Sequence, residues 1–181
     1  PNIENKKLFV KKDIENRMNI LKNMTLLSIK NKPDIILWPE APLPIFYSDL
    51  EQNYYKDIVE VIPKSTTLLT GSFYKKNNNI FNSIINISDK SSNVYSKRHL
   101  VPFGEFLPFR NILSNVYKSL GLNTYDITPG DHTNLLSINS FIAKPLICYE
   151  SIFSAESLVL EKNVDFILNV SNDGWFGETL A

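Results

Sequence analysis

The sequence predicts an α/β layered domain, because helical and strand-like periodicities alternate along it. Apolar residues at helical spacing open the chain, short apolar runs typical of buried strands follow, and an alternating hairpin pattern lies in the middle. The 181 residues are enough for one domain with its own core, and no linker or internal repeat divides them. We therefore expect one domain over residues 1–181.

The composition excludes some kinds of partner. Nineteen basic and nineteen acidic side chains cancel, so the charge gives no electrostatic case for binding nucleic acid. The one cysteine excludes an internal disulfide. No run reaches the roughly 18 apolar residues of a membrane span, and no signal peptide is visible. Because the sequence opens at Pro1 without a Met and stops inside the motif-like stretch 172–177, we expect a piece of a longer protein.

The N-terminal third is predicted to contain two helices with a strand between them. Apolar side chains recur at three- and four-residue steps over 5–31, which indicates a helix that ends at Pro33. The continuous apolar run 35–38 fits a strand that is covered on both faces. The second helix is expected over 49–61, with Asp49 as its N-cap.

A hairpin and then a long excursion are expected in the middle of the chain. Residues 66–74 and 80–88 read as two strands joined by a polar turn, and a further strand begins at 94–97. The stretch 100–128 is dense in Phe and Leu but is broken by Pro, Gly and Asn, so we expect a functional loop with a short helix at 111–120.

The C-terminal third is predicted to return to alternating strands and helices. The expected elements are a strand interrupted at Lys144-Pro145, a helix and a second apolar strand, at 141–147, 155–161 and 164–170 respectively.

Three chemically useful side chains stand at or just past the ends of predicted strands. These are Glu40, Lys97 and Cys148. If their strands belong to one sheet and run the same way, the side chains can meet at its carboxyl edge, where open α/β folds keep their ligands. A thiol near the N-terminus of a following helix is also expected to have a depressed pKa, and the thiolate is the reactive form.

Each of the three residue types suits a separate chemical task. Cys148 would attack a carbonyl, and Glu40 would take the thiol proton and later return it to the leaving group. Lys97 would face the developing oxyanion, with the backbone N–H of Tyr149 as a second donor. Ordinary interpretations stay open for each residue taken singly: a buried free cysteine, a solvated glutamate in a turn and a surface lysine.

Four motifs carry a resemblance to a known family. They are Trp38-Pro39-Glu40-Ala41, the lysine block Tyr95 to Pro108, Ile147-Cys148-Tyr149-Glu150, and Ser171 to Gly177. With them, almost the whole chain resembles the nitrilase superfamily, and within it the nitrilase-like domain of the apolipoprotein N-acyltransferases. The Glu–Lys–Cys order is general to the superfamily, whereas the lysine block and the Cys-Tyr-Glu triplet narrow the resemblance to the acyltransferases.

The resemblance implies a fold and a set of site residues. The fold is the α-β-β-α sandwich of nitrilases, here without its first strand and its C-terminal part. By motif match Glu40 is the base, Lys97 the oxyanion residue and Cys148 the acylated nucleophile, and the chemistry requires no cofactor and no metal. Substrate-binding or supporting roles fall to Glu105, Tyr149, Glu150 and Trp175.

The resemblance also implies an activity, its partners and a location. Enzymes of this family move a fatty acyl chain from a phospholipid to the N-terminal diacylglyceryl-cysteine of an apolipoprotein, through a Cys thioester. The expected location is the bacterial inner (cytoplasmic) membrane, with the catalytic domain on the periplasmic face. The apolar stretches 100–122 and 41–47 are candidates to enter a bilayer or line an acyl pocket, and ordinary core packing is the alternative.

Two other functions stay open on the sequence alone. One is a soluble nitrilase-family amidohydrolase that cleaves a C–N bond with the same three residues. The other is a catalytically silent relative that acts as a binding module, and the intact Glu40, Lys97 and Cys148 argue against it.

Overall fold

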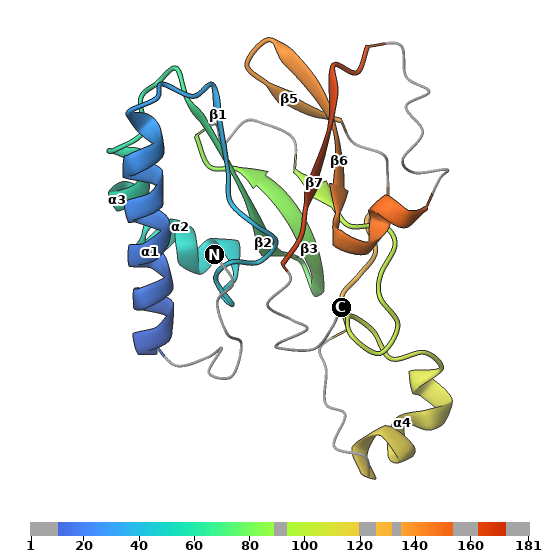
Figure 1. Cartoon of the computed structure of the whole chain (residues 1–181). Coiled ribbons are helices and arrows are strands. Elements are labelled where there is room, and N and C mark those ends of the chain that lie inside the picture. The colour runs from blue at the N-terminus through green and yellow to red at the C-terminus, as the bar shows by residue number, and fades with distance from the viewer. Residues whose placement is uncertain (1–10, 89–93, 120–125, 132–134, 154–162, 173–181) are drawn as a thin grey trace.

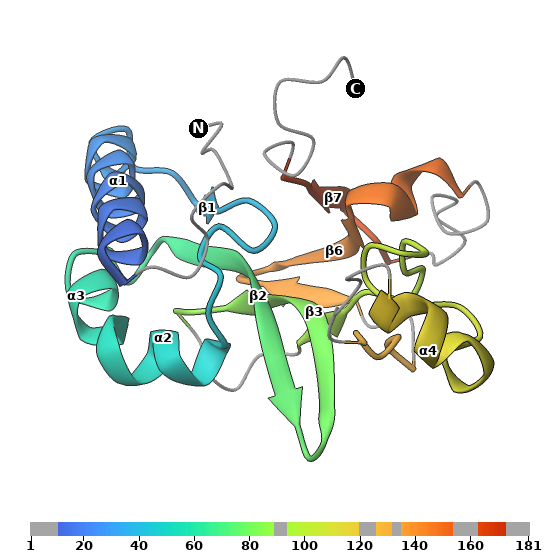
Figure 2. The same ribbon diagram turned by 90° about the horizontal axis from the view of Figure 1, so that it is seen from below.

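A computed structural model describes residues 11–88, 94–119, 126–131, 135–153 and 163–172. Two sheets face each other, and helices cover the outer face of the first sheet (Figures 1 and 2). The described layers are thus helix, sheet and sheet. The helix expected at 155–161, which would cover the second sheet, lies outside the described residues.

The first sheet has the strand order β1-β2-β3-β4. β1 (Ile35–Leu37) runs parallel to β2 (Thr67–Lys76), and β2 forms an antiparallel hairpin with β3 (Asn79–Asn86). Asn77 in the hairpin turn has a φ of 55°, a conformation that asparagine tolerates better than most residues. β4 (Tyr95–Ser96) is antiparallel to β3, so β1 and β4 point the same way.

The second sheet has the order β5-β6-β7. Its strands are β5 (Leu136–Ile138), β6 (Phe141–Ile147) and β7 (Phe166–Val170); β6 is antiparallel to β5 and parallel to β7. The sequence did not predict β5, which is only three residues long. The predicted interruption of the next strand was wrong, because β6 continues through Lys144 and Pro145. Its pairing with β5 ends at Ala143, so the missing N–H of Pro145 removes no bond from that ladder.

The helices lie against the first sheet. α1 (Lys11–Ile29) confirms the described part of the first predicted helix, and its Thr25 hydroxyl accepts a hydrogen bond from Trp38 Nε1 at 3.0 Å. The second predicted helix is divided at Tyr54 into α2 (Tyr47–Asn53) and α3 (Tyr55–Val59).

The expected N-cap of the second helix was also wrong. Phe46 occupies that position, and Asp49 lies in the first helical turn. Phe46 is extended and bridges to Phe73 of β2, which starts the helix earlier than the sequence suggested.

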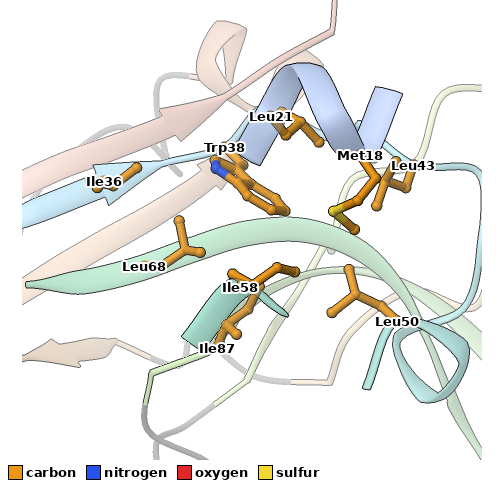
Figure 3. Packing of buried hydrophobic residues seen from close by; sticks show 9 residues of the cluster. All are labelled: Met18, Leu21, Ile36, Trp38, Leu43, Leu50, Ile58, Leu68 and Ile87. Atoms are coloured by element: carbon orange, nitrogen blue, oxygen red, sulfur yellow. The ribbon is translucent and has the colours of Figure 1, made fainter. Parts of the chain in front are cut away.

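Two apolar clusters hold the layers together. The first lies between the helices and the first sheet, and Figure 3 shows Trp38 between α1 and β2 within it. Its members are Met18, Leu21, Ile36, Trp38, Leu43, Leu50, Ile58, Leu68 and Ile87. The second lies between the two sheets and consists of Leu69, Ile84, Tyr95, Leu136, Ile138, Ala143, Ile147, Leu168 and Val170. Burial of this apolar surface is the main force that presses the two sheets together.

The strand at 35–38 and the excursion after β4 both contain exposed apolar side chains. The strand at 35–38 was expected to be covered on both faces, but Leu37 is 41% exposed, because β1 is the edge strand of the described sheet. The excursion after β4 contains the expected short helix, α4 (Arg110–Ser119), which projects away from both sheets (Figures 1 and 2). Phe109 and Ile112, at the start of this helix, are 74% and 79% exposed.

Candidate active site

Glu40, Lys97 and Cys148 lie together. The Nζ atom of Lys97 is 3.5 Å from Glu40 Oε1, and the Cys148 thiol lies within electrostatic range of the Glu40 carboxyl group. Lys97 and Glu40 are both buried, whereas Cys148 is partly exposed. An acid, a cation and a thiol therefore form one cluster, in which the cysteine is the most exposed of the three residues.

The three residues come from two sheets. The sequence had suggested that they could meet at the edge of a single sheet, and this is not the case. Glu40 follows β1 and Lys97 follows β4, which run parallel within the first sheet, but Cys148 follows β6 of the second sheet. The side chains meet because the apolar cluster between the sheets holds their facing ends at packing distance.

A close backbone contact holds the turn that carries Glu40. The N–H of Gly71 donates to the carbonyl oxygen of Pro39 at 3.2 Å. A Cβ atom at Gly71 would lie 2.6 Å from the Cα of Glu40, so only glycine lets β2 approach this turn. Ala41, the next residue, has a φ of 37°, which turns the chain sharply away from the strand.

Lys97 is held in the same manner from two sides. Its N–H donates to the carbonyl oxygen of Asn82, and its own carbonyl accepts from the N–H of Gly130, both at 2.8 Å. A Cβ at Gly130 would collide with the carbonyl oxygen of Ser96. The backbone of Lys97 is therefore fixed, and its side chain is directed by charge.

Two carboxylates share the Lys97 ammonium. Glu105 Oε2 lies 2.9 Å from Nζ, closer than Glu40, and also accepts the N–H of Val101 at 2.8 Å. Glu105 therefore belongs to the charged cluster, as its motif match implied. The loop from Val101 closes on this carboxylate, since the N–H of Glu105 donates back to the Val101 carbonyl.

Cys148 occupies an unusual backbone conformation. It is the first residue of a short 3₁₀ turn, η1 (Cys148–Ile152), and has a φ of 52°. A non-glycine residue in the left-handed region costs about 1–3 kcal/mol, and such strain gathers at functional sites. The backbone N–H of Tyr149, the next residue, lies beside the sulfur, where an oxyanion next to the sulfur could use it as a donor.

Glu150 does not face the thiol. It is fully buried and accepts hydrogen bonds from the Tyr95 hydroxyl and from backbone N–H groups of Arg98, His99 and Ile147. This carboxylate ties the chain after Lys97 to the end of β6, so its role is to support the site.

The remaining expected site residues have different positions. Tyr149 is partly exposed beside the sulfur, and its ring packs edge-on against Phe153 at 5.4 Å. Phe153 also stacks on the ring of His99 at 4.4 Å. Trp175 lies outside the described residues.

The pKa shifts define the resting state of the cluster. Burial raises the pKa of Glu40, although Lys97 and the amide of Asn82 oppose this rise. Burial alone would lower the pKa of Lys97, but Glu40 and Glu105 outweigh it and raise the pKa. The ammonium therefore keeps its proton, and the two carboxylates stabilise its charge.

The expected depression of the thiol pKa was wrong. Burial, and then the charge of Glu40, raise the pKa of Cys148, and Lys97 opposes them only in part. The turn that follows is a five-residue 3₁₀ segment, too short for a strong helix dipole. A thiol with a raised pKa is neutral near pH 7, so it needs a base to become a nucleophile.

Sequence reasoning missed Asn82, which lies on β3 and contacts both carboxylates. Its Nδ2 donates to Glu40 Oε1 at 2.7 Å and to Glu105 Oε1 at 2.9 Å. An asparagine inside a strand of β-branched residues is disfavoured, and this local conflict was the available signal.

Comparison with known proteins decides the family. Residues 7–181 match the model of the carbon–nitrogen hydrolase family. The chain belongs to this family. Carbon–nitrogen hydrolases of known structure share its fold, with a TM-score of 0.55 for the enzyme from Helicobacter pylori, 19% identical over 89% of this chain and 55% of that one. Glutamine-dependent NAD⁺ synthetase from Acinetobacter baumannii gives a TM-score of 0.62, with 17% identity over 87% of this chain and 29% of that one.

Curated relatives within the family are more similar in sequence. An apolipoprotein N-acyltransferase of Wigglesworthia glossinidia brevipalpis is 37% identical over 95% of this chain and 35% of its own length. The apolipoprotein N-acyltransferase of Methylococcus capsulatus is 36% identical over 81% of this chain and 30% of its own. This carbon–nitrogen hydrolase chain thus spans about a third of the length of the curated relatives that it matches.

Proposed function

We propose that the chain carries the catalytic centre of an N-acyltransferase. The reaction would move a fatty acyl chain from a phospholipid to the α-amino group of the diacylglyceryl-modified N-terminal cysteine of an apolipoprotein. The observation that carries this proposal is the 37% identity over 95% of the chain to a relative of that name. The cluster of Glu40, Lys97 and Cys148 supplies the parts that acyl transfer requires.

The first half-reaction would acylate the thiol. Glu40 takes the proton of Cys148 as the sulfur attacks the ester carbonyl of the phospholipid, and a C–S bond forms. The oxyanion that develops is stabilised by Lys97 Nζ and by the N–H of Tyr149. The tetrahedral intermediate then loses the glycerol oxygen, which receives the proton from Glu40 and leaves as the alcohol of a lysophospholipid.

The second half-reaction would release the acyl chain as an amide. The acceptor amine attacks the thioester carbonyl, and Glu40 takes a proton from the nitrogen as the C–N bond forms. The C–S bond breaks, and Glu40 returns that proton to the sulfur. The raised pKa of Glu40 suits both steps, because a base that must also act as an acid works best with a pKa near the working pH.

Exposed apolar side chains on the excursion that follows Lys97 support a lipid substrate and a membrane location. Phe103, Phe109 and Ile112 are exposed on the loop and helix that follow Lys97. Leaving such side chains in water has a cost that insertion into a lipid surface would remove. The location that fits is the periplasmic face of the bacterial inner membrane. Among the described residues, no helix has both the length and the apolar character of a membrane span.

A second function within the family is cleavage of a C–N bond in a small amide. The observation in its favour is the fold shared with a solved carbon–nitrogen hydrolase. The same thiol, base and cation would serve, with water in place of the acceptor amine.

One experiment separates these functions. The full-length protein is incubated with phospholipid vesicles, and the Cys148 peptide is analysed by mass spectrometry. A mass increase equal to one acyl chain, lost when a diacylglyceryl peptide with a free N-terminus is added, supports the transferase. Cys148→Ala is the control. Acylation of another residue, or hydrolysis of small amides without acylation by lipid, would contradict the proposal.

A further inference from the structure

Asn82 is the one described side chain that donates to both Glu40 and Glu105 while being uncharged. The two hydrogen bonds leave from a single nitrogen, Nδ2, at 2.7 Å and 2.9 Å. Its backbone carbonyl also holds the N–H of Lys97. Asn82 therefore forms a hydrogen bond with each of the three charged residues, through its side chain to Glu40 and Glu105 and through its backbone to Lys97.

The orientation of the amide follows from chemistry. Carboxylate oxygens only accept hydrogen bonds when ionised, so the NH₂ group must face them and the oxygen must point away. Among the described residues no group donates to Asn82 Oδ1, although that atom is buried. A buried acceptor without a partner lowers stability. The amide at position 82 therefore lowers stability through its unpaired oxygen, a penalty that an apolar side chain of similar volume would avoid.

The charges around Glu40 explain what the amide does. Glu40 faces the Lys97 ammonium, the Glu105 carboxylate and the Cys148 thiol. Lys97 directly follows β4, Glu105 lies on the loop after it, and Cys148 directly follows β6. Burial and Glu105 both favour the protonated form of Glu40. Lys97 opposes them but is shared with Glu105, which holds it more closely. The hydrogen bond from Asn82 is a second interaction that favours the charged form of Glu40.

We propose that Asn82 is a positioning residue that keeps Glu40 ionised and directed at the Cys148 thiol. The proposal rests on the assignment of Glu40 as the base in the proposed function. A hydrogen bond to the charged form of an acid favours that form. The same bond restricts the carboxylate to an orientation in which it can accept the thiol proton. Asn82 would thus act through Glu40 and would not touch the substrate.

The test measures the pH at which Cys148 becomes reactive. Full-length protein is treated with iodoacetamide at a series of pH values from about 5 to 9, and alkylation of the Cys148 peptide is followed by mass spectrometry. Reactivity rises as the Glu40–Cys148 pair loses its first proton. In Asn82→Leu, which keeps the volume but removes the donor, we expect the midpoint to move upward by about one pH unit. Asn82→Asp should move it at least as far, because it adds a like charge.

Two controls separate this role from simple packing. Asn86→Asp makes the same change on β3 at a similarly buried asparagine, about 13 Å along the strand from position 82. Its midpoint should stay within a few tenths of a unit. In a Glu40→Gln background, Asn82→Leu should produce no shift, because the group through which Asn82 acts is gone.

The possible results decide the question. An upward shift in both Asn82 variants that vanishes in the Glu40→Gln background supports the proposal. An unshifted midpoint in a folded Asn82 variant, an equal shift in Asn86→Asp, or a shift that persists without Glu40 overturns it. The alkylation midpoint is measurable whether or not the protein transfers acyl chains. Failure of the transferase function would therefore appear in the vesicle experiment and leave this result unaffected.

Discussion

The Glu150 carboxylate accepts the backbone N–H of Arg98 at 2.7 Å, across the boundary between the two sheets. Arg98 directly follows Lys97, and Glu150 lies two residues after Cys148. One buried carboxylate therefore fixes how far the ammonium lies from the thiol. The same carboxylate accepts the N–H of Ile147, the last residue of β6.

Glu150→Gln should weaken both the fold and the site. An amide nitrogen in place of one oxygen would face backbone N–H donors and leave at least one of them buried without an acceptor. We expect a loss of about 2–3 kcal/mol in the free energy of unfolding, measured by urea denaturation. The exposed Glu60→Gln is the matched control and should change it by less than about 0.5 kcal/mol. Equal stability of the two variants would contradict the role of Glu150 in connecting the chain after Lys97 to the end of β6.

Glu40→Gln should lower both the acylation and the pKa of Cys148. Acylation by phospholipid should fall about 10²–10⁴-fold, because the base is lost. The pKa of the thiol should fall, because the charge of Glu40 helps to raise it. Mass spectrometry measures acylation, and the ultraviolet absorbance of the thiolate at a series of pH values, taken against Cys148→Ala, measures the pKa of the thiol. Normal acylation in this variant would remove Glu40 from the mechanism.

Lys97→Met should destabilise the fold in a manner that depends on pH. Without the ammonium, Glu40 and Glu105 are buried together, and the pKa of Glu40 rises further. An acid whose pKa is raised on folding destabilises the native state above its ordinary value and not below it. The loss should reach about 3–5 kcal/mol at neutral pH and shrink toward about pH 4.

Denaturation curves at a series of pH values would check the Lys97 prediction. Lys56→Met, at an exposed position on α3, is the control and should show little change. A destabilisation of Lys97→Met that is the same at acid and neutral pH would show that lost packing, and not charge, is the cause.

Gly71→Ala should displace the turn that carries Glu40. The added Cβ would lie 2.7 Å from the carbonyl oxygen of Pro39, a backbone atom that cannot move alone. We expect a loss of about 1–3 kcal/mol, together with a lower rate of Cys148 acylation. Gly104→Ala is the control, since its Cβ would meet nothing nearer than a Val101 methyl at 3.6 Å. If both alanine variants unfold at the same denaturant concentration, the close approach at Gly71 is not a constraint.

The exposed side chains of Phe109, just before α4, and of Ile112 within it should contribute to vesicle binding. Replacing Phe109 and Ile112 together by Ser removes two apolar groups, each worth about 1.5–3 kcal/mol when fully buried. Cosedimentation with phospholipid vesicles should weaken about tenfold or more. The paired control is Met24→Ser with Leu27→Ser, since both residues are exposed on α1. Equal weakening by the two pairs would exclude a specific lipid-facing surface on α4.

Local periodicity predicted much of the fold. α1, the β2–β3 hairpin and α4 all follow from short-range patterns of apolar and turn residues, and the structure confirms them within a few residues over the part of the chain that it describes. Local patterns did not predict the three-residue β5, because so short a strand depends on its partner β6 and not on its own sequence. The break at Tyr54 and the exposure of Leu37 likewise depend on tertiary packing.

The sequence indicated three central residues of the candidate site but not its geometry, and it missed Asn82. Strand-end chemistry and motif resemblance indicated Glu40, Lys97 and Cys148, which the structure brings together. Their origin in two sheets is a property of the packed sandwich, and no strand pattern encodes which sheet a strand joins. The raised thiol pKa and the contacts of Asn82 depend on burial by distant segments.

Cys148 follows a strand of the second sheet, whereas Glu40 and Lys97 follow strands of the first. The cluster of the three residues therefore exists only where the two sheets pack together. Neither layer can hold a working site by itself, however well folded it is. A slip of the layers by the length of one bond would leave every strand intact and yet separate thiol from carboxylate. Acylation of Cys148 should therefore be lost at a lower denaturant concentration than the secondary structure of either sheet. The activity would then report how tightly the two sheets pack against each other.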